Sequence, residues 1–200
     1  MMNDSLLAAA ENYARERLSG KRYAHTLRVA DTAERLAELH DLDPGRARIA
    51  ALLHDSARER GKEEMLRVAE EQGIRAIDLE HERPMLLHGP VAAKLAKMEL
   101  GVDDDEVLDA VRAHTTGEPG MRPLALALYV ADKIEPDRSQ PGVETLRKLA
   151  LKDLRRAATV ALDRSISYNE ERGRPTHPKS YETLEWLERR EGKRSKERGV

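Results

Sequence analysis

The chain has 200 residues and a formal net charge of −2, with 36% charged and 40% apolar residues. This length suits a single domain, and the near-neutral charge gives no general case for a nucleic acid or a membrane as partner. The chain has no cysteine, which excludes disulfides, thiolate metal sites and cysteine-ligated iron–sulfur clusters, and leaves imidazole and oxygen as the strong metal ligands.

Alanine and leucine are abundant, phenylalanine is absent, and runs of valine or isoleucine are few. This composition favours helices over strands, so we expect an all-α protein. The first ten residues are only mildly apolar and contain neither a basic leader nor a long apolar run, so they predict neither a signal peptide nor a membrane anchor. We therefore expect a cytoplasmic protein.

The first part of the chain predicts three helices, over about 3–18, 21–40 and 44–55. Asp43 is placed to cap the third helix and Pro44 to begin it. That helix is apolar until it ends in the adjacent pair His54-Asp55. His25 lies in the first turns of the second helix, and His40 at its end is expected to be a solvated helix terminus.

The middle of the chain predicts a short helix over about 62–72, a polar connector over 73–83, and two further helices. The first of these begins at Pro90, with His88 at its entrance, and closes at Gly101. The second, capped by Asp103 to Asp105, carries His114 on its apolar stripe. The loop that follows His114 is typical of the mouth of a pocket.

The last part predicts helices over about 123–134, 143–152 and 154–171, a constrained loop over 173–178, and a final amphipathic helix. Asp132 interrupts an apolar helix, and a buried carboxylate there needs a cation, which Lys133 or a metal could supply. We expect one domain over residues 1–188, with a metal-site core at about 21–178, and a charged, disordered tail over 189–200.

Six chemically active side chains therefore fall on or beside apolar helical turns. One divalent metal site with nitrogen and oxygen ligands, holding one or two ions, explains all of them together, whereas hydrogen-bonded core residues would need a separate explanation for each. Arg58, three residues after Asp55, either forms an intrahelical ion pair or holds a phosphate. The six are His25, His54, Asp55, His88, His114 and Asp132.

In order and type, His25, His54-Asp55 and Asp132 match the signature of the HD-superfamily phosphohydrolases. The sequences at 87–90, 114–117, 132–136 with Arg138, and 176–178 resemble the YqeK-type subfamily, which hydrolyses diadenosine tetraphosphate symmetrically to two ADP. The resemblance spans about Tyr23 to Pro178. It implies a single HD-domain helical bundle and an acid anhydride hydrolase that attacks the polyphosphate with metal-activated hydroxide.

The resemblance also implies roles for individual residues. His25, His54, Asp55 and Asp132 would ligate one metal, and His88 and His114 would complete a second site with Asp55 as the bridge. His54, Asp55 and Arg58 would be catalytic, although many HD proteins carry lysine where this chain has Arg58. The residues that would bind substrate are His25, His88, His114, Thr115, Asp132, Arg138, Thr176, His177 and Pro178.

Iron is the metal that the family implies, while the ligand chemistry equally allows manganese, cobalt, nickel or zinc. The expected partner is a small dinucleoside polyphosphate substrate. We expect no nucleic acid or membrane partner, and a homodimer is possible. Three alternatives remain: an HD phosphohydrolase acting on another nucleotide or a cyclic nucleotide, a nucleotide-sensing module without turnover, and a nucleic-acid binder through Arg189 to Arg198. The last is disfavoured because acidic residues mix with the basic ones and no aromatic platform accompanies them.

Overall fold

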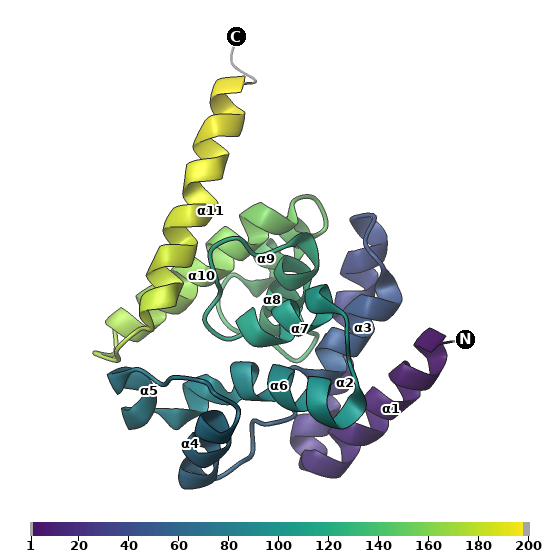
Figure 1. Cartoon of the computed structure of the whole chain (residues 1–200). Coiled ribbons are helices and arrows are strands. Elements are labelled where there is room, and N and C mark those ends of the chain that lie inside the picture. Colours follow the sequence, from purple (N-terminus) through teal and green to yellow (C-terminus); the bar gives the residue numbers. More distant parts are fainter. Residues whose placement is uncertain (1, 198–200) are drawn as a thin grey trace.

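The computed structural model describes residues 2–197 of the chain, with side chains for 5–189; Met1 and residues 198–200 lie outside. Every regular element among the described residues is helical, which confirms the all-α prediction (Figure 1). The elements are α1 (Met2–Arg17), α2 (Gly20–Leu39), α3 (Pro44–Leu53), α4 (Lys62–Glu71), α5 (Asp78–Glu82), the 3-10 helix η1 (Pro84–Leu87), α6 (His88–Leu100), α7 (Asp105–Ala113), α8 (Pro123–Ile134), α9 (Val143–Ala150), α10 (Leu154–Glu170) and α11 (Pro178–Glu197).

Local sequence signals account for several helix boundaries. The Asp43 carboxylate accepts a hydrogen bond from Arg46 N at 3.0 Å and Pro44 begins α3, as predicted. Asp104 caps α7 by accepting from Glu106 N and Val107 N at 3.0 and 3.2 Å. Gly101 ends α6 in the left-handed conformation, φ +66°, which glycine adopts without strain.

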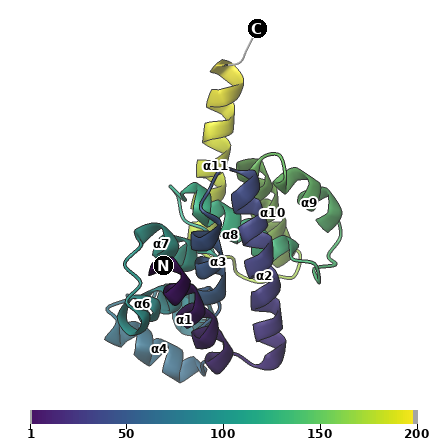
Figure 2. The same cartoon turned by 90° about the vertical axis from the view of Figure 1, so that its right-hand side faces the viewer.

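The core lies where α3 and α8 cross the middle of the helical bundle (Figures 1 and 2). α2 packs along α3, and α8 packs against α2, α3, α7 and α10. Nearly every side chain of α8 is buried, Asp132 included, because this helix is covered on several sides. Removal of the apolar side chains of α8 from water favours this burial. Asp132 lies on the same helix and is therefore buried with them, although burial of a carboxylate is unfavourable.

Three features differ from the sequence-based expectations: the connector over 73–83, the burial of His40 and the end of the C-terminal helix. The connector over 73–83 contains the short helix α5, where Glu80 accepts a hydrogen bond from Ile77 N at 2.9 Å. His40 is half-buried, not solvated, since its Nε2 lies 2.7 Å from the carbonyl oxygen of Ala150 on α9. That partner is 110 residues away and gives no local signal.

The C-terminal helix α11 also continues past the expected boundary at residue 188 and reaches Glu197 (Figure 1). Disorder was expected from residue 189, but good helix formers and a Glu185–Arg189 ion pair one turn apart favour a longer helix. The expected tail over 198–200 lies outside the described residues. No described helix is long and apolar enough to cross a membrane.

Candidate metal centre

Five helices bring the six predicted side chains together in the interior. His25 lies on α2, the pair His54-Asp55 directly follows α3, His88 begins α6, His114 directly follows α7, and Asp132 lies near the end of α8. All six are buried, with exposed fractions between 0 and 8%. The helix termini converge because α3, α6, α7 and α8 pack against one another.

Asp55 stands between two groups of imidazoles and presents one carboxylate oxygen to each. Its Oδ2 lies 3.5 Å from His54 Nε2 and 4.0 Å from His25 Nε2. Its Oδ1 lies 3.2 Å from His88 Nε2 and 3.7 Å from His114 Nε2. In each of these two groups the possible ligand atoms all lie within 4.8 Å of one another. Asp55 therefore belongs to both groups of possible ligands.

The opposite ring nitrogens are held by hydrogen-bond acceptors. The Nδ1 atoms of His54, His88 and His114 lie 2.5, 2.5 and 2.7 Å from the backbone oxygens of Ala51, Met85 and Val111. His25 Nδ1 faces the Glu135 carboxylate at 3.2 Å. An Nδ1 that faces an oxygen acceptor carries the proton, so each neutral ring turns an Nε2 lone pair toward the cluster.

This arrangement fits a bound cation. The Nε2 atoms of His88 and His114 face each other across 2.9 Å. His25 Nε2 likewise meets Asp132 Oδ1 at 3.1 Å. Within the described part of the chain, the buried Nε2 atoms of His25 and His54 have no hydrogen-bond partner. Divalent ions between these lone pairs would satisfy them, with imidazole and carboxylate as suitable ligands.

The electrostatics of the site keep the imidazoles in the form that binds metal. Burial lowers the pKa of His54 to about 4, and burial also lowers the pKa of His88 and of His114. Burial opposes ionisation of Asp55, but the imidazoles of His54, His114 and His88 outweigh it and hold the pKa of this carboxyl well below its usual range.

Asp132 has two cationic neighbours in addition to His25. Lys133 Nζ lies 2.6 Å from its Oδ2, and Arg138 Nη2 lies 2.8 Å from its Oδ1. Although burial raises the pKa of the Asp132 carboxyl, the ammonium group of Lys133 outweighs it and keeps the pKa well below the usual range. Arg138, which the family resemblance names as a substrate-binding residue, thus pairs with Asp132 in this structure.

Arg22 occupies the place beside Asp55 that the sequence suggested for Arg58. Arg58 Nη1 lies 3.2 Å from His88 Nδ1. The guanidinium that pairs with Asp55 comes from Arg22 on α2, whose Nη1 lies 3.1 Å from Asp55 Oδ2. No local pattern marks Arg22 as a partner of Asp55, because it lies 33 residues before Asp55 in a charged first turn.

A cavity of about 370 Å³ opens beside His25. Its lining includes the basic residues Lys21, Arg22, Arg28 and Arg138, with three carboxylates among them. Arg22 and Arg138 each reach a carboxylate of the cluster, so this cavity lies next to the candidate metal centre, with His25 in its lining. Basic side chains there favour an anionic ligand.

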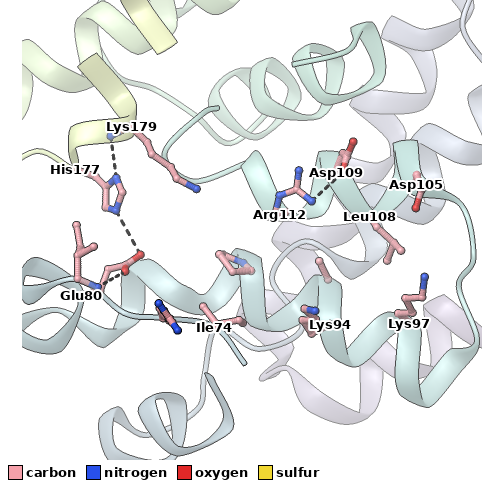
Figure 3. A pocket seen from close by; sticks show the side chains of 14 residues that line it. Ile74, Glu80, Lys94, Lys97, Asp105, Leu108, Asp109, Arg112, His177 and Lys179 are labelled. Carbon is pink, nitrogen blue, oxygen red and sulfur yellow. Dashed lines mark hydrogen bonds and ion pairs between the residues drawn. The ribbon is translucent and has the colours of Figure 1, made fainter. Parts of the chain in front are cut away.

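Thr115 lies in the cluster, but the expected loop at 176–178 lies apart from it. Thr115 Oγ1 is 3.2 Å from the Nε2 atoms of both His88 and His114. His177 instead lines a separate cavity of about 400 Å³ between α5, α6, α7 and the start of α11, where its Nε2 faces Glu80 at 3.4 Å (Figure 3). Thr176 accepts a hydrogen bond from Asn169, and Pro178 begins α11.

An all-helical domain with buried imidazoles and carboxylates at its helix ends is a metal-binding protein of the nitrogen-and-oxygen ligand class. The family model of the HD domain matches residues 22–137. The chain therefore belongs to the HD domain family.

Two relatives that align with most of the chain carry the same description. A protein of Bacillus subtilis (strain 168) described as "Bis(5'-nucleosyl)-tetraphosphatase, symmetrical" is 42% identical over 173 residues, which cover 86% of this chain and 92% of that protein. A protein of Halalkalibacterium halodurans with the same description is 38% identical, over 85% and 90% of the two chains.

A solved structure is similar over almost the whole fold. It is described as a predicted HD superfamily hydrolase involved in NAD metabolism from Clostridium acetobutylicum. Its TM-score is 0.88 at 38% sequence identity, and the match covers 92% of this chain and 97% of that one. The helical arrangement is thus shared with a member of the same superfamily.

Proposed function

We propose that the chain is a metal-dependent hydrolase that cleaves diadenosine tetraphosphate symmetrically into two ADP. The observation that carries this is the joint presence of 42% identity to a symmetrical tetraphosphatase over most of both chains and a buried cluster of four imidazoles around Asp55. Cleavage of the central phosphoanhydride adds water to one phosphorus atom and releases ADP on each side.

The proposed chemistry depends on charge. Divalent ions, when bound, supply Lewis acidity that neutralises phosphoryl oxygens and acidifies water near neutral pH. For this chain we propose that His25, His54, Asp55 and Asp132 hold one ion. His88 and His114 would hold a second ion, with Asp55 facing both.

The basic residues around the cluster have a second role in this proposal. Arg138 would bind phosphate oxygens at the mouth of the cavity beside His25, and Arg58 would do so beside His88. His54, Asp55 and Arg58 are the proposed catalytic residues. ADP is a good leaving group once its charge is neutralised, so no strong general acid is required.

The other proposed substrate-binding residues lie at different distances from the cluster. Thr115 contacts both His88 and His114, so it is placed to meet a phosphate. The loop of Thr176, His177 and Pro178 is proposed to contact a nucleotide on the strength of the family resemblance. Alanine substitution of His177 tests this, because an increase in KM with unchanged metal content would support a nucleotide contact.

We further propose iron as the physiological metal and one HD-type domain reaching to about residue 188. Elemental analysis of protein purified without added metal tests the metal, with manganese, cobalt, nickel or zinc as the alternatives. The proposal does not require a homodimer, since one chain supplies every residue of the cluster.

Product analysis tests the function itself. Diadenosine tetraphosphate is incubated with the metal-loaded protein, and the nucleotides are separated by chromatography, with Asp55→Ala as the matched control. ADP alone is the expected product, whereas AMP with ATP would contradict symmetrical cleavage. A panel with guanosine polyphosphates, a nucleoside monophosphate, a cyclic nucleotide and NAD distinguishes the other HD activities, and binding without any turnover would indicate a sensing module.

A further inference from the structure

Glu135 is a buried carboxylate that contacts the candidate metal centre without belonging to either group of possible ligands. It follows α8 directly and is 3% exposed. Its Oε1 lies 3.2 Å from His25 Nδ1, on the side of the ring opposite to the cluster. Its other oxygen, Oε2, accepts hydrogen bonds from Arg28 Nε at 2.7 Å and from Asp137 N at 2.9 Å.

His25 differs from the other three imidazoles in how its Nδ1 is held. His54, His88 and His114 each follow the last turn of a helix, and each Nδ1 faces the backbone oxygen three residues earlier. A carbonyl near the end of a helix keeps a lone pair that can accept a side-chain hydrogen bond, even where, as at Met85, it also accepts a backbone N–H. In those three cases the helix end itself orients the ring.

The ring of His25 cannot be oriented by a carbonyl at a helix end, because His25 lies in the sixth position of α2, a 20-residue helix. The carbonyls one turn before it accept backbone hydrogen bonds within the helix. The ring therefore needs an acceptor from elsewhere, and α8, which packs against α2, supplies it through Glu135.

We propose that Glu135 is a positioning residue for the metal centre: it accepts the Nδ1 proton of His25 and thereby fixes the tautomer whose Nε2 lone pair points at the metal. Arg28 and the Asp137 amide hold the second oxygen, which fixes the direction of the carboxylate. Such outer partners raise the basicity of a ligating imidazole and hold its orientation. This inference depends on the metal centre of the proposed function, but not on its substrate.

A purely structural role would explain the same contacts differently. Glu135 would then only join α2 to the end of α8 through Arg28, and its loss would lower the stability of the fold while leaving the affinity for metal unchanged. The test therefore needs measurements on folded protein that report on the His25 ring and on metal binding separately.

The experiment compares Glu135→Ala and Glu135→Gln with the control Glu34→Gln. Glu34 lies on α2, as His25 does, and like Glu135 it pairs with an arginine, Arg48, at 2.8 Å, but its side chain is 37% exposed. Two quantities are measured on the full chain: the Kd for Mn²⁺ by equilibrium titration, and the tautomer of His25 in the metal-free protein by proton–nitrogen NMR of the ring.

For Glu135→Ala we expect the Kd for Mn²⁺ to rise by about 10–100-fold and His25 to lose the fixed Nδ1-protonated tautomer. Glu135→Gln should weaken Mn²⁺ binding less, because its amide oxygen can still accept the Nδ1 proton. Glu34→Gln should match the wild type in both measurements.

A folded Glu135→Ala protein that keeps the wild-type Kd and the Nδ1-protonated ring would overturn the proposal. If Glu135→Ala does not fold, Glu135→Met decides, since it keeps the length of the side chain but has no oxygen to accept the Nδ1 proton: a raised Kd supports the proposal and an unchanged Kd overturns it. Failure of the proposed function is distinguishable, because it would appear as absent hydrolysis of diadenosine tetraphosphate by the wild type while Mn²⁺ binding stays normal.

Discussion

Asp55 is the residue on which the two halves of the candidate metal centre depend. One of its oxygens faces His25 and His54, and the other faces His88 and His114, while the side chain is 6% exposed. A buried carboxylate in contact with four imidazoles is costly unless a cation completes the group. At the scale of single residues, the site is therefore more sensitive to this position than to any exposed one.

Alanine substitution of Asp55 or of His54 should abolish hydrolysis and reduce the bound metal. We expect the rate to fall by more than about 100-fold, the upper end of what loss of an outer partner of a metal ligand costs. Activity assays and elemental analysis measure both effects, and circular dichroism checks that helicity is largely retained. The exposed His81, replaced by alanine, is the matched control; full activity in either site variant would refute the assignment.

The buried imidazoles also predict how the stability of the metal-free protein depends on pH. The pKa of His54 is about 4 in the fold and 6.5 as its ordinary value, so the unfolded chain takes up a proton at higher pH than the folded chain. Stability should therefore fall as the pH is lowered from 6.5 to about 4, with about 3 kcal/mol of the loss from His54. His88 and His114 act in the same direction.

Urea unfolding at several pH values, with a chelator present, measures this dependence. The variant His54→Gln, which has no titrating ring, should show a shallower loss of stability across the same range. A free energy of unfolding that stays constant between pH 6.5 and 4 in the wild type would contradict the prediction.

At the scale of elements, the site depends on how closely the start of α6 approaches the end of α7. Gly89 lies in the first turn of α6, and a Cβ atom there would lie 2.9 Å from the oxygen of Arg112, 3.1 Å from that of Val111 and 3.2 Å from His114 Nδ1. Only glycine lets the two helices bring His88 and His114 into contact without a shift of the backbone.

Gly89→Ala should therefore separate α6 from α7 and weaken the site. We expect a loss of about 1–3 kcal/mol in stability, typical of overpacking, together with weaker Mn²⁺ binding. Thermal unfolding and metal titration measure the two effects. Gly61→Ala is the matched control, because nothing lies within 4 Å of a Cβ atom at that position; equal stability of the two variants would refute the packing argument.

The end of α11 should matter little for the site. The buried side chains of this helix that the structure describes, Ser180, Thr183 and Leu187, all precede residue 190. Removal of residues 191–200 should leave the rate of hydrolysis nearly unchanged. A large loss of activity in the truncated chain would show that this segment contributes to the substrate site.

At the scale of the whole molecule, the metal should link function to stability. Five helices contribute to one cluster, and an ion that binds the folded state alone stabilises it by mass action. With free Mn²⁺ at about 100 times its Kd, the free energy of unfolding should rise by about 2.7 kcal/mol.

Calorimetry or chemical unfolding of chelated and metal-loaded protein measures this increment, and readdition of metal should restore activity. Asp55→Ala should show little or no increment under the same conditions. A wild-type protein whose stability does not respond to metal would contradict the presence of ligands in the folded core.

Local patterns in the sequence determined the helices and the types of ligand. Asp43 with Pro44 marked the start of α3, the apolar stripe ending in His114 marked α7, and an isolated Asp132 in an apolar helix required a cation. These signals act within one or two turns of a helix, so they can be read without the fold.

Only the tertiary structure decided which groups meet. His40 with Ala150, Arg22 with Asp55, His25 with Glu135 and His177 with Glu80 are separated by 33 to 110 residues. Helix periodicity says which face of a helix turns inward, but not which other helix that face meets. The convergence of the imidazole Nε2 atoms around Asp55 follows from the packing of α2, α3, α6, α7 and α8, a long-range property that no local pattern contains.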